Sequence, residues 1–214
     1  MFITQNVLKK TIISNYYCIF FLKSFYIIIS KKDLTTTTWQ GGTTTQLYIY
    51  PENASYLERN FDFRISTAKV ESETSQFTSL PNVHRKLMVL DGSIIINHEG
   101  QHSKKLAKFD LDTFEGNWKT SAIGTCTDFN LMSTNNNEGN IEAFQLAKNQ
   151  DLLIHKEVNS KWLILYIYTG KINIEIEDKP ITIDEGSVFI LNSEIDFELL
   201  IKGVQDSEVI ASKI

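Results

Sequence analysis

Arg64 and Ser66 are the pair of residues best placed to bind a ligand. They lie two positions apart in Phe61–Val70, where polar residues alternate with Phe63 and Ile65. This period of two predicts a strand with one face in the core and with Arg64 and Ser66 on the other face. A guanidinium on that face can hold a carboxylate through two parallel hydrogen bonds. The equal alternative is a structural role, in which the arginine pairs with an acid of the protein itself.

Three further polar residues could complete such a site or neutralise the arginine. Arg85 stands directly before an apolar strand and suits either a ligand or a structural partner. Asp128 and Asn130 stand two positions apart, so they share one face of a strand. Asp128 could hold Arg64, which would leave Asn130 to recognise a ligand amide. Because a buried charge is costly unless it is paired, Asp128, Glu142 or water must compensate Arg64 in the empty protein.

The segment Thr35–Gln46 has an unusual composition, with threonines on both sides of two adjacent glycines. No apolar period runs through it, so we do not expect a core element. One interpretation is the rim of a small-molecule pocket, because hydroxyls, amides and permissive glycine backbone surround one large aromatic residue. The alternative is a Thr-rich strand, turn and strand. The candidate ligand contacts in this segment are Trp39, Gly41, Gly42, Thr44 and Gln46.

The histidines do not form a pattern typical of a metal site. The chain has four, at positions 84, 98, 102 and 155, and none forms a His-x-His pair. His98, Glu99 and His102 come nearest to a ligand set, but they surround a turn glycine, where helical i, i+4 geometry does not apply. We therefore expect no metal and no cofactor, and we assign no catalytic residue. Cys126 is expected to be a small buried apolar residue and not a nucleophile.

The composition is that of an ordinary globular protein with an acidic balance. Of 214 residues, 42% are hydrophobic and 22% are charged, and the net charge is −5. Scattered lysines and arginines in an acidic chain argue against a nucleic-acid-binding surface. Two distant cysteines, Cys18 and Cys126, predict no disulfide framework and fit a reducing, cytoplasmic compartment. The sequence does not determine the oligomeric state, and a homodimer is one possibility.

Residues 1–24 contain two adjacent lysines followed by an interrupted apolar run. The run resembles a signal peptide but lacks a small-residue cleavage site, and Lys23 makes it too broken for a membrane span. We interpret it as a non-homologous extension before a first strand at Tyr26–Ser30, with an interfacial anchor as the alternative. A chain beginning at Phe25 is accordingly expected to keep its melting temperature. A large loss on thermal unfolding would show that the extension packs on the core.

Short alternating segments separated by glycine turns predict an almost entirely β protein. Residues 86–97 form an apolar strand, a glycine turn and a second strand, and residues 163–176 repeat this form. Glu115-Gly116 after the next alternating segment corresponds to Glu185-Gly186 in the second copy. This repeat predicts two similar small β-barrels packed together, with one large β-sandwich as the alternative. The predicted barrels occupy residues 25–133 and 134–214.

Five short motifs together resemble the HutD/Ves family. In chain order they are Trp39-Gln-Gly-Gly-Thr-Thr, Phe63-Arg-Ile-Ser-Thr-Ala68, Arg85 before the apolar strand ending in Asp91-Gly92, Phe114-Glu-Gly116 and Asp128-Phe-Asn-Leu-Met132. The resemblance extends from about residue 26 to the C-terminus, by motif in the first half and by pattern in the second. It implies a bicupin, that is, two jelly-roll-like barrels of the RmlC-like cupin superfamily in one chain.

The resemblance also implies a bacterial function connected with histidine utilisation or stress responses, as a small-molecule-binding regulator or modulator. We therefore expect a metal-free protein that binds a small carboxylate or amide, with no nucleic-acid partner and no membrane span. A metal-independent cupin enzyme of the isomerase type is the alternative. Such an enzyme needs a titratable group that faces the pocket, and His84 beside Arg85 is the candidate.

Overall fold

The computed structural model describes residues 5–6, 25–134, 137–176 and 179–214. Apart from Gln5–Asn6, the extension at 1–24 lies outside these residues, so its dispensability stays a prediction. The described chain is built of β-strands with one short 3-10 helix, η1 (Lys31–Asp33). Among these residues, no helix has the length and hydropathy needed to cross a bilayer. Two compact units divide the chain, one of residues Leu34–Ile141 and the other of Glu142–Ile214 with the described residues up to Asp33.

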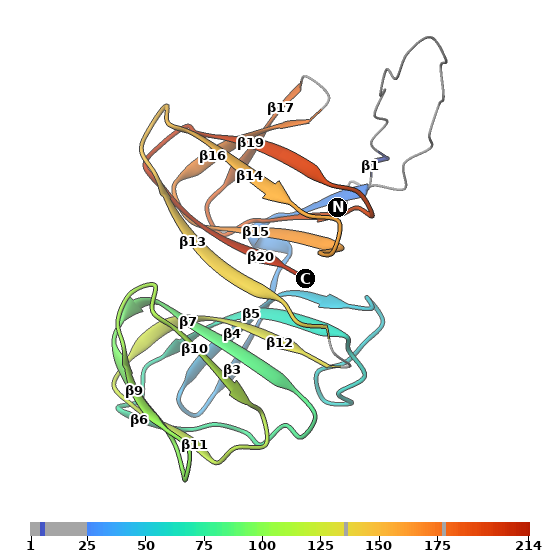
Figure 1. The fold of residues 1–214 in the computed structure, drawn as a ribbon. Coiled ribbons are helices and arrows are strands. Elements are labelled where there is room, and N and C mark those ends of the chain that lie inside the picture. Colours follow the sequence, from blue (N-terminus) through green and yellow to red (C-terminus); the bar gives the residue numbers. More distant parts are fainter. Residues whose placement is uncertain (1–4, 7–24, 135–136, 177–178) are drawn as a thin grey trace. The chain divides into compact units, whose positions relative to one another are not determined.

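The Leu34–Ile141 unit consists of a six-stranded and a four-stranded antiparallel sheet (Figure 1). The first sheet has the order β10-β7-β12-β5-β4-β3 and contains β3 (Thr35–Trp39), β4 (Gly42–Tyr50), β5 (Phe63–Val70), β7 (His84–Gly92), β10 (Leu111–Glu115) and β12 (Cys126–Ser133). The second has the order β6-β11-β8-β9 and contains β6 (Thr74–Gln76), β8 (Ile94–His98), β9 (Ser103–Leu106) and β11 (Thr120–Ile123). A core cluster joins the two sheets, because it includes Leu87 of β7, Ile96 of β8 and Ala122 of β11.

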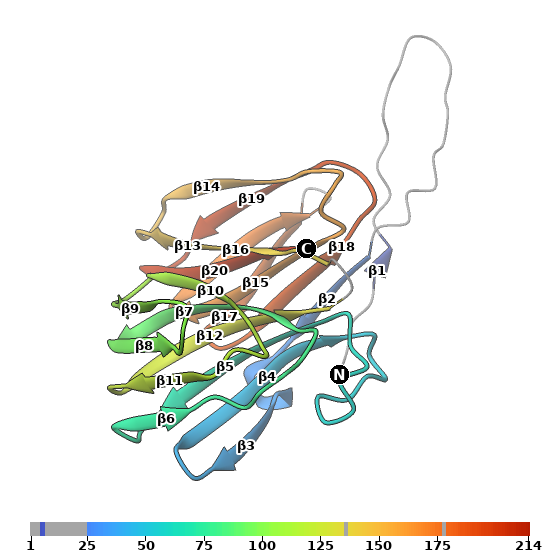
Figure 2. The same cartoon turned by 60° about the horizontal axis from the view of Figure 1, so that its bottom comes forward.

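The other unit is built in the same way (Figure 2). Its first sheet has the order β1-β2-β18-β15-β20-β13 and contains β1 (Gln5–Asn6), β2 (Phe25–Ile29), β13 (Asn140–Leu146), β15 (Trp162–Thr169), β18 (Val188–Asn192) and β20 (Ser207–Lys213). Its second sheet has the order β14-β19-β16-β17 and contains β14 (Asp151–Lys156), β16 (Lys171–Ile176), β17 (Lys179–Asp184) and β19 (Phe197–Gly203). Leu165, Ile174 and Leu199 contribute to the core that joins these sheets.

The strand orders confirm the all-β, two-barrel repeat. The run β10-β7-β12-β5 in one unit corresponds to β18-β15-β20-β13 in the other, and β6-β11-β8-β9 corresponds to β14-β19-β16-β17. The correspondence predicted at Glu115-Gly116 is wrong by one strand. Glu185-Gly186 lies between β17 and β18, whereas Glu115-Gly116 follows β10, which is the counterpart of β18. The two Glu-Gly sequences are identical, but the strands beside them are not equivalent in the two sheets.

The observed division of the chain differs from the predicted boundary at residue 25. Strand β2 pairs antiparallel with β18, with Tyr26 opposite Leu191, so it belongs to the sheet of the C-terminal unit. The apolar period of Phe25–Ile29 predicts a strand but not its partner, because pairing with β18 is a contact between segments distant in sequence. Residues 34–141 therefore form the first barrel, in place of 25–133.

Candidate ligand-binding site

The inward face of β12 and its two neighbours, β5 and β7, positions a group of polar side chains inside the first barrel. Arg64 and Met132 are opposite each other across β5 and β12, and Met132 and Arg85 are opposite each other across β12 and β7. The two arginines therefore lie in one row of the sheet, on either side of Met132. Side chains in such a row point to the same face, so both guanidinium groups lie on one side of the sheet.

A cavity of about 370 Å³ opens beside this row. This volume is within the range of small-molecule sites, about 300–1,000 Å³. Seven predicted contacts line it, namely Trp39, Thr44, Arg64, Ser66, Arg85, Asp128 and Asn130. Nine more residues complete the lining, namely Thr37, Tyr56, Ala68, Val70, Ser75, Gln76, Phe77, Thr78 and Met132. Of the other three predicted contacts, Gln46 bonds Arg64 from outside the lining, Gly41 lies in the turn of the β3–β4 hairpin, and Gly42 begins β4.

Arg64 is buried and held in place by neutral groups. Its Nε donates to Oε1 of Gln46 at 2.9 Å, and its Nη1 donates to Oγ of Ser66 at 3.1 Å. The ring of Tyr56 lies 4.5 Å from its guanidinium carbon. Burial lowers the pKa of Arg64, because the charged form is disfavoured away from water. The three contacts orient the guanidinium, and none of them supplies a negative charge.

Arg85 is buried still more completely, with 6% of its surface exposed. Its Nη2 donates to Oδ1 of Asn130 at 3.3 Å, and its guanidinium carbon lies about 5 Å from the rings of Phe77 and Phe114. Its buried Nε has no hydrogen-bond partner. Burial lowers the pKa of Arg85 to about 10, so the side chain stays charged at neutral pH. A buried donor without a partner costs free energy and marks a place where a ligand acceptor would be favourable.

Asp128 lies in the same cavity but does not form a close ion pair with either arginine. Its Oδ1 accepts a hydrogen bond from Nδ2 of Asn130 at 2.5 Å. Burial raises the pKa of Asp128 to about 7, although the positive charge of Arg85 and hydrogen bonds from Ala68 and Asn130 act in the opposite direction. Within the described residues, no carboxylate lies within ion-pair distance of Arg64 or Arg85. The predicted structural pairing of Arg64 with Asp128 is absent, and Glu142 instead lies 3.7 Å from Lys213.

The Thr-rich segment forms the β3–β4 hairpin, as the strand–turn–strand interpretation predicts. Part of it also agrees with the interpretation as a pocket rim. Thr36 and Thr45 hydrogen-bond across the hairpin through their hydroxyls at 2.8 Å. Trp39 turns back over the strand pair, and its Nε1 donates to Oγ1 of Thr44 at 3.2 Å. These last two residues also line the cavity, which places one end of the hairpin at its rim.

The remaining sequence candidates, His84 and Cys126, do not line the cavity. His84 is exposed, and its Nδ1 lies 2.8 Å from Oε1 of Glu115. Cys126 is buried, as expected, and burial with the nearby Asp128 charge raises the pKa of its thiol to about 12. It therefore stays protonated at neutral pH and is a poor nucleophile.

Sequence reasoning missed the aromatic residues that surround the arginines. Tyr56 comes from a polar loop, and Phe77 follows the three-residue strand β6. Neither lies in a segment with a clear period. The signal that could have found them is composition, because a lone aromatic residue in a polar loop near two arginines is a candidate cation–π partner.

A family model described as HutD matches residues 31–209. The conserved protein of unknown function PA5104 from Pseudomonas aeruginosa PAO1 superposes with a TM-score of 0.74 at 17% identity, covering 88% of this chain and 97% of that chain. HutD from Pseudomonas fluorescens SBW25 gives a TM-score of 0.64 at 15% identity, with 88% and 99% covered. The bacterial pirin YhhW from Escherichia coli, solved in complex with nickel(II), gives 0.66 at 8% identity, with 88% and 98% covered.

These similarities establish the bicupin architecture, since the matched structures span nearly the whole chain. At such identities they show the fold alone. No curated protein matches the chain significantly in sequence. The chemistry of the cavity must therefore be argued from its own residues.

Proposed function

The chain belongs to the HutD family, and we propose that it binds a small carboxylate or amide metabolite in the cavity beside Arg64 and Arg85. In this proposal it is a cytoplasmic regulator or modulator of amino-acid catabolism of the histidine-utilisation type or of a stress response. The ligand supplies the negative charge that the cavity lacks. Binding needs no metal or cofactor in this cavity.

The observation that carries the proposal is the unbalanced charge of two buried arginines. A buried cation is costly unless it is paired. Both guanidinium groups donate their hydrogen bonds to neutral amide and hydroxyl oxygens, and Nε of Arg85 has no partner among the described residues. A ligand carboxylate could accept two charge-assisted hydrogen bonds, each worth about 1.5–3 kcal/mol. Ser66 and Asn130 could then recognise a hydroxyl or an amide of the same ligand.

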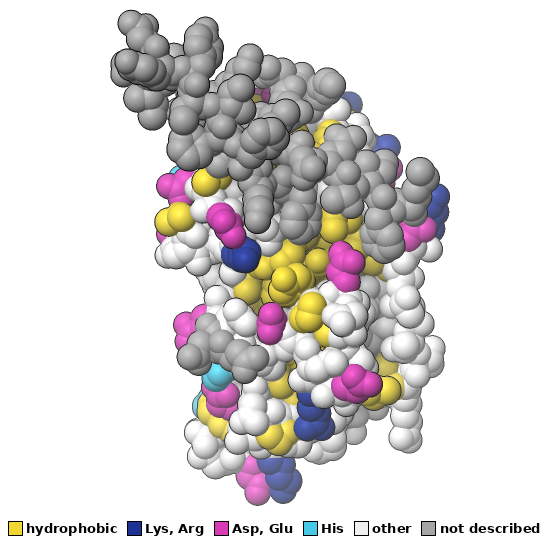
Figure 3. Space-filling model, turned by 90° about the vertical axis from the view of Figure 1, so that its right-hand side faces the viewer, with side chains coloured by type: hydrophobic (Ala, Val, Ile, Leu, Met, Phe, Trp, Pro, Cys, Tyr) yellow, Lys and Arg dark blue, Asp and Glu magenta, His cyan; other side chains and the backbone are white. Residues whose placement is uncertain are grey.

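The surface supports a small ligand over a nucleic acid. On the face drawn in Figure 3, the described Lys and Arg side chains are scattered among Asp and Glu side chains and form no basic patch. The net charge of −5 also disfavours nucleic-acid binding, because it repels the negatively charged phosphate backbone. By contrast, the two buried arginines form a local positive centre sized for a metabolite.

A thermal-shift screen of small mono- and dicarboxylates, their amides and their amino-acid relatives tests the proposal. A ligand present at 100 times its Kd should stabilise the protein by about 2.7 kcal/mol. Formate belongs in the screen as the smallest carboxylate, since the Pseudomonas fluorescens HutD structure comes from a formate condition. Stabilisation only by amines or by uncharged sugars would contradict the proposal.

We predict that affinity for the carboxylate falls about threefold to tenfold as the pH rises from 6 to 8. Small carboxylates are ionised throughout this range. Arg85, with a pKa of about 10, stays charged, and the Cys126 thiol stays neutral. Asp128, with a pKa raised to about 7, loses its proton within the range and then competes with the ligand for the arginines. Binding should therefore be tighter at low pH and should take up a proton.

Calorimetric titration at several pH values measures this dependence, and Asp128→Asn is the matched control. The asparagine keeps the shape of the side chain but cannot ionise, so its affinity should change little between pH 6 and 8. If the affinity of the wild-type protein instead rises with pH, a group other than Asp128 controls the pH dependence of binding.

A second candidate function is general acid–base catalysis by Asp128. The alternative based on His84 has no support, because that side chain pairs with Glu115 and does not line the cavity. Asp128 does line it, and a carboxyl with a pKa of about 7 can both give and take a proton at neutral pH. Exchange of ligand C–H hydrogens for deuterium in heavy water, detected by NMR and absent in Asp128→Asn, would support the enzyme. Tight binding without exchange would support the regulator.

A further inference from the structure

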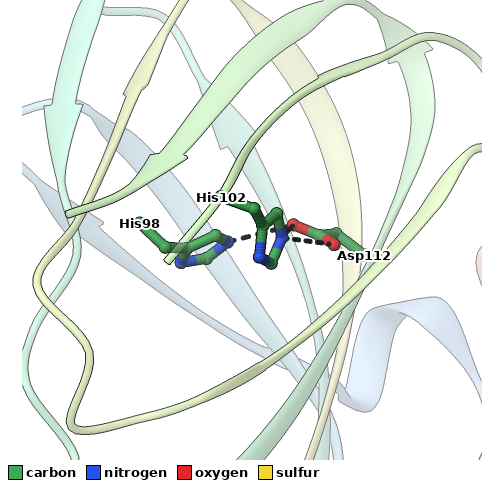
Figure 4. A group of neighbouring side chains, drawn as sticks. All are labelled: His98, His102 and Asp112. Atoms are coloured by element: carbon green, nitrogen blue, oxygen red, sulfur yellow. Dashed lines mark hydrogen bonds and ion pairs between the residues drawn. The ribbon is translucent and has the colours of Figure 1, made fainter. Parts of the chain in front are cut away.

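We propose that His98, His102 and Asp112, which lie side by side in the first barrel (Figure 4), form a binding site for a zinc-like divalent cation. One ligand atom from each residue lies within 4.8 Å of the other two. None of the three lines the ligand cavity, so this site is separate from the proposed function. The sequence-based expectation of no metal rested on the absence of a His-x-His pair, and the nearest ligand set considered there had Glu99 in place of Asp112.

The fold brings the three ligands together from the β8–β9 hairpin of one sheet and from strand β10 of the other sheet. The β8–β9 turn closes with N–H of His98 donating to the carbonyl of His102 at 2.8 Å, and the two imidazole rings lie 4.6 Å apart. Asp112 points inward from β10 in the same alternation as Phe114. Glu99 points elsewhere and forms a short exposed ion pair with Lys119.

The distances from each histidine to Asp112 are already close to those of a tetrahedral coordination shell. Nε2 of His98 lies 3.0 Å from Oδ2 of Asp112, and Nε2 of His102 lies 3.2 Å from both carboxylate oxygens. Ligand atoms about 2.0–2.1 Å from a tetrahedral Zn²⁺ lie about 3.3–3.4 Å apart. Only small shifts are therefore needed to admit an ion, with water as the fourth ligand. Two imidazoles and one carboxylate form a ligand set that Zn²⁺ accepts.

Thr120 on β11 is a positioning residue for His98. Its Oγ1 lies 2.7 Å from Nδ1 of His98 and 3.3 Å from the carbonyl of Trp118. Without metal, the hydroxyl can donate to Nδ1, and Nε2–H of His98 then donates to Asp112. With metal, the imidazole can take the other tautomer, so that Nδ1–H donates to Thr120 and the hydroxyl turns to the Trp118 carbonyl. This partner outside the coordination shell frees Nε2 for the cation without leaving a buried group unsatisfied.

Burial and charge set the expected strength of the site. His98 is fully buried, and burial lowers its pKa, so its imidazole is neutral and able to bind metal. The side chain of His102 is 40% exposed, which gives the ion a path from solvent. Asp112 supplies one negative charge, whereas Arg85 is close enough to act on His98 as an opposing positive charge. We therefore expect a Kd on the order of micromolar.

Calorimetric titration of Zn²⁺ into chelator-treated, full-length protein tests the proposal. We expect one equivalent with micromolar affinity, weakened at least about tenfold in His102→Ala and in Asp112→Asn. His102 is partly exposed, so this variant should stay folded. Co²⁺ provides a second measurement, because a tetrahedral site gives it visible absorption. Trp118, with its ring 5.4 Å from that of His98 and 5.8 Å from that of His102, should lose fluorescence when Co²⁺ binds.

Two controls separate a metal site from a hydrogen-bond network. His155→Ala removes an exposed histidine that lies 3.8 Å from Glu198, and Zn²⁺ binding should be unchanged. Thr120→Val should weaken binding about tenfold, and Thr120→Ser should restore it. Failure of the wild type to bind one equivalent of Zn²⁺, or equal affinities in wild type and His102→Ala, would overturn the proposal. The three side chains would then be a structural network only.

Discussion

Arg64→Lys is expected to weaken binding of the carboxylate ligand by at least about tenfold, and Arg64→Met by about a hundredfold. Lysine keeps the positive charge but loses the planar fork that matches a carboxylate. Methionine loses the charge as well, and removal of one partner from a buried ion pair costs about 2–5 kcal/mol. Gln46 and Ser66 already bond Nε and Nη1 of Arg64, so the guanidinium has a defined orientation before the ligand arrives.

Calorimetric titration of the three proteins with the best ligand of the thermal-shift screen measures this effect. Arg59→Lys is the matched control, because Arg59 is exposed and lies outside the cavity lining. Melting temperatures of all variants are needed in parallel. If Arg64→Lys binds as well as the wild type, Arg64 is not part of the site. If its melting temperature collapses, the residue is structural, as the alternative interpretation of the sequence holds.

Gly42→Ala is expected to destabilise the protein by at least about 2 kcal/mol. A Cβ at this position would lie 1.9 Å from the carbonyl oxygen of Lys69, on the neighbouring strand β5. The backbone also has φ of +151°, which side-chain-bearing residues rarely adopt. Backbone strain of this kind costs about 1–3 kcal/mol, and an overlap with fixed backbone adds a cost of similar size. Gly42, predicted as a ligand contact, is thus explained by the close approach of two strands.

Urea unfolding of Gly42→Ala and two glycine controls separates these causes. Gly100→Ala has φ of +77° but nothing within 4 Å of the added Cβ, so it should lose only about 1 kcal/mol. In Gly41→Ala the added Cβ meets the ring of Trp39, which is 40% exposed and can move. This variant should keep most of its stability but lose ligand affinity, because Trp39 lines the cavity. Equal stabilities of the Gly42 and Gly100 variants would contradict the steric argument.

The strands and their repeat were predictable because their signal is local. In β5, alternation of Phe63 and Ile65 with Arg64 and Ser66 assigns opposite faces, and a slip of one residue would exchange them. The shared order of strand, turn glycine and strand in β7–β8 and β15–β16 indicates two related barrels in the same way, although the two strands of each pair belong to different sheets. The predicted correspondence of Glu115-Gly116 with Glu185-Gly186 was wrong, because the same turn sequence can follow different strands.

Local patterns also identified most of the polar cavity. Seven of the ten predicted contacts line it, since residues on one face of β5 and of β12 must project into the same barrel. The three others, Gly41, Gly42 and Gln46, belong to the hairpin or support Arg64. Their types suggested a pocket rim, but glycine serves close strand approach equally well.

The sequence by itself determined the strand faces, the two-barrel repeat and the chemical character of the candidate site. Only the tertiary structure decided which distant groups meet. Arg64 and Arg85 come together over Met132 because both of their strands pair with β12. Asp112, and not the adjacent Glu99, joins His98 and His102 because β10 alternates toward the barrel interior. Side-chain alternation is a property of each strand, whereas strand pairing depends on the whole fold, so only the first can be deduced from local sequence.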